Sequence, residues 1–118
     1  MEFKFKKEYP DFLKRKEESV KLRAQCPDKI PIICEKDPKS RIDDIDKTKY
    51  LVPGDLPINK FIAMIRKRVR VSEEEAFYLL IGGKQINGDG IMKEIYEKFK
   101  DRDDGFLYCV YASELTWG

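Results

Sequence analysis

The chain has 118 residues, of which 42% are apolar and 39% charged, the size and composition of one globular domain. Its 24 basic and 22 acidic side chains leave a net charge of +2, which argues against a general nucleic-acid binder. Histidine is absent, which removes Ser-His-Asp and Cys-His catalysis and histidine-based metal sites. The composition therefore predicts neither an enzyme nor a bound cofactor or metal.

The first 26 residues are predicted to form a basic two-helix extension. The segment FKFKKEYP, residues 3–10, is short and amphipathic and is closed by Pro10. The next segment reads as a helix that Asp11 caps and Pro27 ends. Its expected apolar stripe is formed by Phe12 or Leu13, Val20 and Ala24.

Residues 27–112 predict an α+β unit. KIPIICEK, residues 29–36, is β-branched and apolar and indicates a strand, in which Pro31 indicates a sheet edge or a strand start. A loop and a second short strand, TKYLVP, follow. The clearest helix has apolar side chains at helical spacing on one face: Ile58, Phe61, Ile62, Ile65 and Val69.

The remaining elements complete a recognisable order. AFYLLI indicates a third strand, GGKQINGDG a series of turns, IMKEIYEKF a short helix and FLYCVYA a buried last strand. This order predicts a β-grasp fold, a four-stranded mixed sheet over one central helix, with the two N-terminal helices added. Residues 113–118 are a polar tail.

The cysteines give no sign of chemistry. An odd number, Cys26, Cys34 and Cys109, without C-x-x-C spacing argues against a disulfide framework or a zinc site. Cys34 and Cys109 lie in strand-like runs, where a cysteine is usually a small buried hydrophobe. No run approaches the ~20 apolar residues of a membrane span, so we expect a cytoplasmic chain that reaches a membrane only by attachment.

The last residue, Gly118, has two interpretations. It marks the end of a tail, or it is the reactive end of a protein built to be attached to something. Glycine has no Cβ and adopts unusual backbone angles freely, so a narrow enzyme channel admits it where other residues clash. The residue alone does not separate the two interpretations.

Four segments resemble the autophagy-related protein 8 family: CPDKIPIICEK, DIDKTKYLVPGDL, FIAMIRKRV and FLYCVYASELTWG. The family contains the ubiquitin-like modifiers related to the GABA type A receptor-associated protein and the microtubule-associated protein light chains. The resemblance spans essentially the whole chain. It implies a ubiquitin-like core with two N-terminal helices, and conjugation through Gly118 to phosphatidylethanolamine by activating and conjugating enzymes. A cysteine protease processes family members and also cuts the lipid amide.

The resemblance also implies a groove for an extended aromatic-x-x-aliphatic motif, carried by cargo receptors and adaptors, which adds a strand beside the second strand. The pocket for the aromatic residue comprises Glu18, Leu22, Pro31, Ile33, Lys49, Leu51 and Phe106. The pocket for the aliphatic residue comprises Tyr50, Val52, Pro53, Leu56, Phe61, Met64, Ile65 and Arg68. Acidic residues before the motif are expected to contact Lys47, Lys49 and Arg68.

Two functions stay open. The first is a conjugated membrane tag of the autophagosome or another vesicle; the second is a ubiquitin-like trafficking or microtubule-associated adaptor that is never conjugated. Both predict the groove, and only the first requires Gly118. In relatives the basic helices contact tubulin or assist membrane tethering. This implies an acidic partner for Lys4, Lys6, Lys7, Lys14, Arg15 and Lys16.

Overall fold

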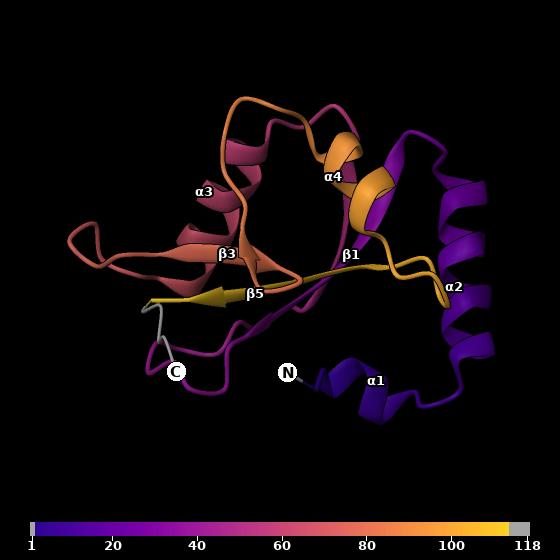
Figure 1. Cartoon of the computed structure of the whole chain (residues 1–118), viewed down its shortest axis with the longest axis horizontal. Helices are drawn as coiled ribbons and strands as arrows, with labels where there is room; N and C mark the ends of the chain where they lie inside the picture. Colours follow the sequence, from indigo (N-terminus) through magenta and orange to yellow (C-terminus); the bar gives the residue numbers. More distant parts are fainter. Residues whose placement is uncertain (1, 114–118) are drawn as a thin grey trace.

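The structure is a computed structural model that describes residues 2–113 of the chain (Figure 1). Its elements, in chain order, are α1 (Lys4–Glu8), α2 (Phe12–Gln25), β1 (Lys29–Lys36), β2 (Lys49–Pro53), α3 (Ile58–Val69), β3 (Tyr78–Ile81), β4 (Lys84–Gln85), α4 (Met92–Phe99) and β5 (Leu107–Ala112). The predicted helices and the four predicted strands are confirmed. The prediction of turns alone between β3 and α4 is wrong, because this segment also forms the short strand β4.

The strands form one mixed sheet in the order β2-β1-β5-β3-β4. β1 and β5 are parallel, and the other neighbours are antiparallel. The apolar stripe of α3 packs on one face, and its predicted members Ile58, Phe61, Ile65 and Val69 are buried there. α1 lies on the opposite side of β5 from α3 (Figure 1). This arrangement is the predicted β-grasp with additional N-terminal helices.

Pro31 lies near the start of β1, which is one of the two positions predicted for it. β1 is not a sheet edge, however, because it pairs with both β2 and β5. Proline has no N–H to donate. The position is tolerated because the pairing with β5 begins one residue later, at Ile32 opposite Leu107. The alternative of a sheet edge at Pro31 is therefore wrong.

The second helix packs through polar groups, and the predicted apolar stripe on α2 is wrong. Phe12, Leu13 and Val20 are 46%, 60% and 57% exposed, and Ala24 is also exposed. The buried side chains of α2 are Arg15 and Ser19, and Leu22 adds a partly buried apolar contact. The sequence pattern misleads here because a charged residue is buried with its partner, while three large apolar side chains face outward.

That partner is Asp104, which is completely buried in the loop before β5. Its carboxylate accepts hydrogen bonds from Arg15 Nε at 2.8 Å, the Tyr108 hydroxyl at 2.5 Å and the Phe106 N–H at 2.9 Å. Its backbone carbonyl accepts a further bond from the Ser19 hydroxyl. Burial and the bond to Asp104 raise the pKa of Tyr108, which stays protonated as a donor. One carboxylate thus joins α2 to β5.

The first helix is held by another carboxylate. Glu35 on β1 accepts the backbone N–H groups of Lys4 at 2.8 Å and Phe5 at 3.0 Å, and so satisfies free donors in the first turn of α1. The Phe5 ring is buried against Ile33 and Phe106 on the sheet face opposite α3. α1 therefore covers part of the sheet beside α2.

The Asp104 network predicts a large stability effect. We expect Asp104→Ala to lower the free energy of unfolding by about 3–5 kcal/mol, because it leaves Arg15 buried without a counter-charge. Urea denaturation followed by circular dichroism measures the change. The matched control is Asp103→Ala, whose exposed side chain should contribute less than about 0.5 kcal/mol. Similar small losses in both variants would contradict the assigned role.

Candidate functional site

The outer strand β2 is the structural centre of the candidate site. Among residues 2–113 it pairs with β1 on one side only, and Pro31 of β1 lies opposite Leu51. Because proline cannot donate, Pro31 and Leu51 form a non-hydrogen-bonded pair, and the hydrogen-bonded pairs are Ile32 with Tyr50 and, two residues on, Cys34 with Thr48. The bond from Cys34 N–H to Thr48 C=O, at 2.8 Å, agrees with this alternation of hydrogen-bonded and non-hydrogen-bonded pairs. The N–H and C=O groups of Lys49 and Leu51 therefore face away from β1.

The same alternation separates the predicted pocket residues into two groups. Tyr50 and Val52 belong to the core between the sheet and α3. Lys49 lies opposite Ile33, and Leu51 opposite Pro31, on the face that α1 and α2 cover. The structure thus brings the two predicted pockets to opposite faces of one strand edge, as an extended ligand with alternating side chains requires.

The predicted aromatic-pocket residues form a buried base and a partly accessible rim. Pro31, Ile33 and Phe106 are fully buried. The rim consists of side chains of intermediate exposure from α2 and β2: Glu18, Leu22, Lys49 and Leu51. The ammonium group of Lys49 forms an ion pair with Glu18, which connects the two walls.

Phe5 is a residue of this region that the sequence analysis did not assign. Its ring packs on Phe106 with a centroid distance of 5.2 Å, and Lys49 Nζ lies 5.6 Å from the Phe5 ring centroid. It therefore covers part of the base on which an aromatic ligand would rest. The alternating aromatic and lysine residues of FKFKK were the available signal, since one face of this segment is apolar.

The predicted aliphatic-pocket residues lie between β2 and α3. Buried members are Tyr50, Val52, Phe61 and Ile65; Leu56 is half-buried, and Pro53, Met64 and Arg68 are exposed. The Tyr50 ring packs edge-on against Phe61 at a centroid distance of 6.4 Å, and its hydroxyl donates to the Lys47 carbonyl at 2.5 Å. Burial raises the pKa of Tyr50, which stays a neutral donor.

The three predicted contacts for acidic residues differ in their present partners. Arg68 Nε bonds Asp46 at 2.9 Å, and Lys49 bonds Glu18. Lys47 is exposed, with its ammonium 5.2 Å from the Tyr50 ring centroid. An acidic ligand would therefore exchange partners with Lys49 and Arg68 and would add a partner to Lys47.

Two of the three cysteines are inaccessible as nucleophiles. Cys34 and Cys109 are completely buried, and burial raises the pKa of both thiols. Within residues 2–113, no group of three or more Cys, Asp or Glu side chains is arranged to hold a metal ion. In the same range, no helix is both long and apolar enough to cross a bilayer. Gly118, the predicted conjugation residue, lies outside the described residues.

These features define the class: a ubiquitin-like β-grasp protein with two N-terminal helices and an open strand edge. The chain belongs to the Atg8 family of ubiquitin-like autophagy proteins, since the profile described as "Autophagy protein Atg8 ubiquitin like" matches residues 14–118.

Individual relatives agree over the full length. The chain is 48% identical to Autophagy-related protein 8 of Emericella nidulans over 118 residues, which cover 100% of this chain and 98% of the relative. It is also 48% identical to Autophagy-related protein 8 of Coccidioides immitis, with 100% and 99% covered. The crystal structure of Trypanosoma brucei ATG8 superposes with a TM-score of 0.89 at 38% identity and covers 100% of both chains.

Proposed function

We propose that this protein is a ubiquitin-like modifier that is conjugated through Gly118 to phosphatidylethanolamine and recruits cargo receptors and adaptors during autophagosome formation. The observation that carries the recruiting role is the outer strand β2, whose edge is flanked by apolar side chains on both faces. In this proposal residues 1–26 are an added extension, 27–112 the ubiquitin-like core and 113–118 the conjugation tail.

The recruiting step is the addition of a strand. A ligand segment beside β2 forms main-chain hydrogen bonds with the outward N–H and C=O groups of Lys49 and Leu51. Successive side chains of such a segment point to opposite faces of the sheet. An aromatic residue would therefore contact Leu22 and Leu51 on the α2 side, and the aliphatic residue of the motif would contact Leu56 and Met64 beside α3.

Accessibility divides the predicted residues by role. Side chains that keep exposed surface can contact a ligand directly: Glu18, Leu22, Lys49, Leu51, Pro53, Leu56, Met64 and Arg68. The buried members support them from below: Pro31, Ile33, Tyr50, Val52, Phe61, Ile65 and Phe106. We propose that acidic residues before the motif bind Lys47, Lys49 and Arg68, with a contribution that weakens as salt concentration rises.

The membrane step needs a covalent attachment. The amine of phosphatidylethanolamine would attack the activated Gly118 carbonyl and displace the activating group, which leaves as an amide bond forms and the amine loses a proton; the two acyl chains then anchor the protein at about 0.8 kcal/mol per buried CH₂. Activating and conjugating enzymes would form this bond, and a cysteine protease of the family would cut it. The protein would then be divided between the cytoplasm and an autophagosome or other vesicle membrane.

The basic helices give limited support to a second contact with tubulin or with anionic lipid. Among the six cations assigned to it, Arg15 is buried with Asp104, and Lys6 bonds Asp101 at 2.8 Å. The exposed members are Lys4, Lys7, Lys14 and Lys16. An acidic surface would therefore meet these four lysines and not Arg15.

The groove predicts a specific loss of binding. A peptide with an acidic stretch followed by Trp-x-x-Leu should bind with roughly micromolar affinity, about −8 kcal/mol. We expect Leu51→Ala to weaken binding by about tenfold or more, because the lost methylene contacts contribute about 0.8 kcal/mol each. Isothermal titration calorimetry measures the affinity. Leu13→Ala, which removes an exposed leucine from α2, is the matched control and should bind normally. Unchanged affinity of the Leu51→Ala variant would place the ligand elsewhere.

The conjugation role predicts dependence on the last residue. With activating and conjugating enzymes of a relative, ATP and phosphatidylethanolamine liposomes, the protein should become a liposome-bound species, and Gly118→Ala should block this because the added Cβ obstructs the enzyme channel. Liposome flotation and gel shift measure the product. Leu51→Ala should be lipidated normally. Lipidation of Gly118→Ala at the normal rate would contradict the role of Gly118, and peptide binding without any lipidation would favour the non-conjugated adaptor.

A further inference from the structure

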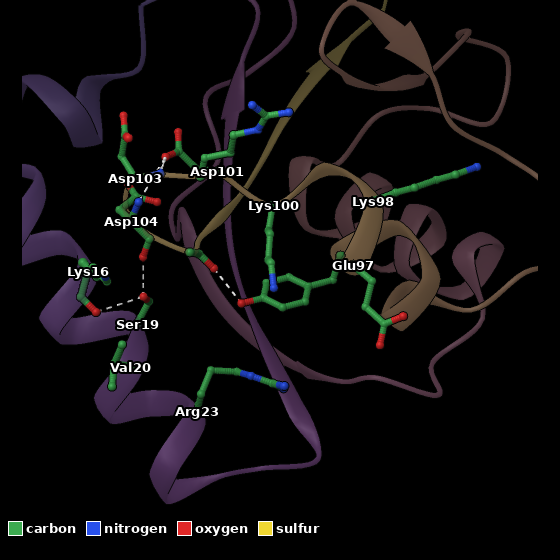
Figure 2. Close-up of a pocket in the computed structure, with 13 residues that line it drawn as sticks. Lys16, Ser19, Val20, Arg23, Glu97, Lys98, Lys100, Asp101, Asp103 and Asp104 are labelled. Atoms are coloured by element: carbon green, nitrogen blue, oxygen red, sulfur yellow. Dashed lines mark hydrogen bonds between the residues drawn. The ribbon is translucent and has the colours of Figure 1, made fainter.

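A groove runs between α2 and α4 and is distinct from the β2 edge. It consists of two adjoining hollows, of about 530 and 610 Å³, which share Arg23, Tyr96, Glu97 and Lys100. Figure 2 shows the first hollow, with α2 along one side and the α4 segment along the other. The floor is Tyr96, which is 6% exposed and whose hydroxyl donates to the Gly105 carbonyl at 2.7 Å.

Two cations approach the ring of Tyr96. The guanidinium carbon of Arg23 lies 5.4 Å and Lys100 Nζ 5.5 Å from the ring centroid. Among residues 2–113, neither cation forms an ion pair with a carboxylate. Arg23 is oriented by bonds from its guanidinium to the backbone carbonyls of Lys29 at 2.7 Å and Pro27 at 3.2 Å. The positive charge at this position is therefore held in place and is not neutralised by a neighbouring acid.

The wider lining has the same imbalance. Asp101 and Asp104 are paired with cations outside the hollow, namely Lys6 and Arg15. The charged lining side chains that form no ion pair within the described part of the chain, apart from Lys98, are Lys16, Arg23, Lys100 and Arg102 against Glu97 and Asp103 in the first hollow, with Lys29 and Lys93 against Asp28 and Asp55 added in the second. The groove therefore presents an excess of positive charge above an aromatic floor, which favours an anionic ligand.

We propose that this groove binds an acidic segment of a partner protein, with a carboxylate or phosphate group held between Arg23 and Lys100 above Tyr96. Two adjoining hollows fit an extended chain, and the exposed side chain of Val20 at the rim offers it an apolar contact. A flat bilayer surface does not reach a floor recessed between two helices. The second hollow is also lined by Pro53, which is assigned to the motif groove, but Arg23, Tyr96 and Lys100 belong to neither proposed role, so a test on Arg23 and Lys100 is independent of motif binding and conjugation.

The test compares two lysines of the same segment. Lys100 Nζ lies 5.5 Å from the ring centroid of Tyr96, whereas Figure 2 shows Lys98 directed away from the hollow. We expect a fluorescein-labelled oligoglutamate peptide to bind at low salt, and Lys100→Gln or Arg23→Gln to weaken it about three- to fivefold, the range of a partly exposed ion pair. Lys98→Gln should leave the affinity unchanged. Fluorescence anisotropy measures binding, and a matched phosphoserine peptide compares phosphate with carboxylate as the bound group.

Three outcomes would overturn the proposal. Equal losses in the Lys98→Gln and Lys100→Gln variants would show diffuse attraction to surface charge. Absence of peptide binding would show that the groove does not bind acidic peptide segments. Binding to phosphatidylserine vesicles that depends on Arg23 and Lys100, without peptide binding, would assign the groove to a membrane. Because Arg23 also bonds backbone carbonyls, thermal unfolding checks its variant; Lys100→Gln removes no such bond and keeps the test valid.

Discussion

The phase of the hydrogen bonds between β1 and β2 is the constraint on which the candidate site depends. Pro31 cannot donate, so its pair with Leu51 is not hydrogen-bonded, and the neighbouring pair of Ile32 with Tyr50 is. A shift of one residue would reverse both the facing of every β2 side chain and the direction of every β2 backbone group. The register between β1 and β2 therefore determines both which β2 backbone groups face a ligand and which β2 side chains lie on each face of the sheet.

A second constraint sets the position of α2, which lies beside the β2 edge and forms one wall of the candidate site. α2 is held by the buried pair of Arg15 and Asp104, with Ser19 as a further contact, and Leu22 adds an apolar contact to the cluster of Phe5, Ile33 and Phe106. A charged pair of this kind stabilises less than an apolar contact of equal size, but it selects one orientation through its directional bonds. Glu18 and Leu22 face β2 because Arg15 and Ser19 face the loop before β5.

Much of the fold could be predicted from the sequence. The stripe on α3 has a strict helical period, and the apolar runs of β1 and β5 are unambiguous, since β1 is buried on both faces and β5 is buried on one face and partly buried, at Tyr108 and Val110, on the other. The prediction fails where burial is decided by partners far along the chain. No residue close to Arg15 in the sequence indicates that it pairs with Asp104. The apolar spacing on the helix therefore predicted that Phe12 and Val20 are buried, but both are exposed.

The residues of the candidate site were assigned from the family resemblance, which carried no information on their present contacts. The resemblance assigned Lys49 and Arg68 to the groove, but it did not show that Glu18 and Asp46 already pair with them. Those acids lie 31 and 22 residues away along the chain, and the pairs arise only when the sheet and helices come together. Phe5 likewise reaches the base of the aromatic pocket only because Glu35 holds the start of α1.

The most direct test of strand addition at β2 is amide hydrogen exchange measured residue by residue by NMR, with and without the acidic Trp-x-x-Leu peptide. The N–H groups of Tyr50 and Val52 already face β1, so their exchange should be slow in both states. Those of Lys49 and Leu51 should exchange rapidly in the free protein and become protected when the peptide binds. Saturating peptide that leaves the Lys49 and Leu51 amides unprotected would contradict strand addition at this edge.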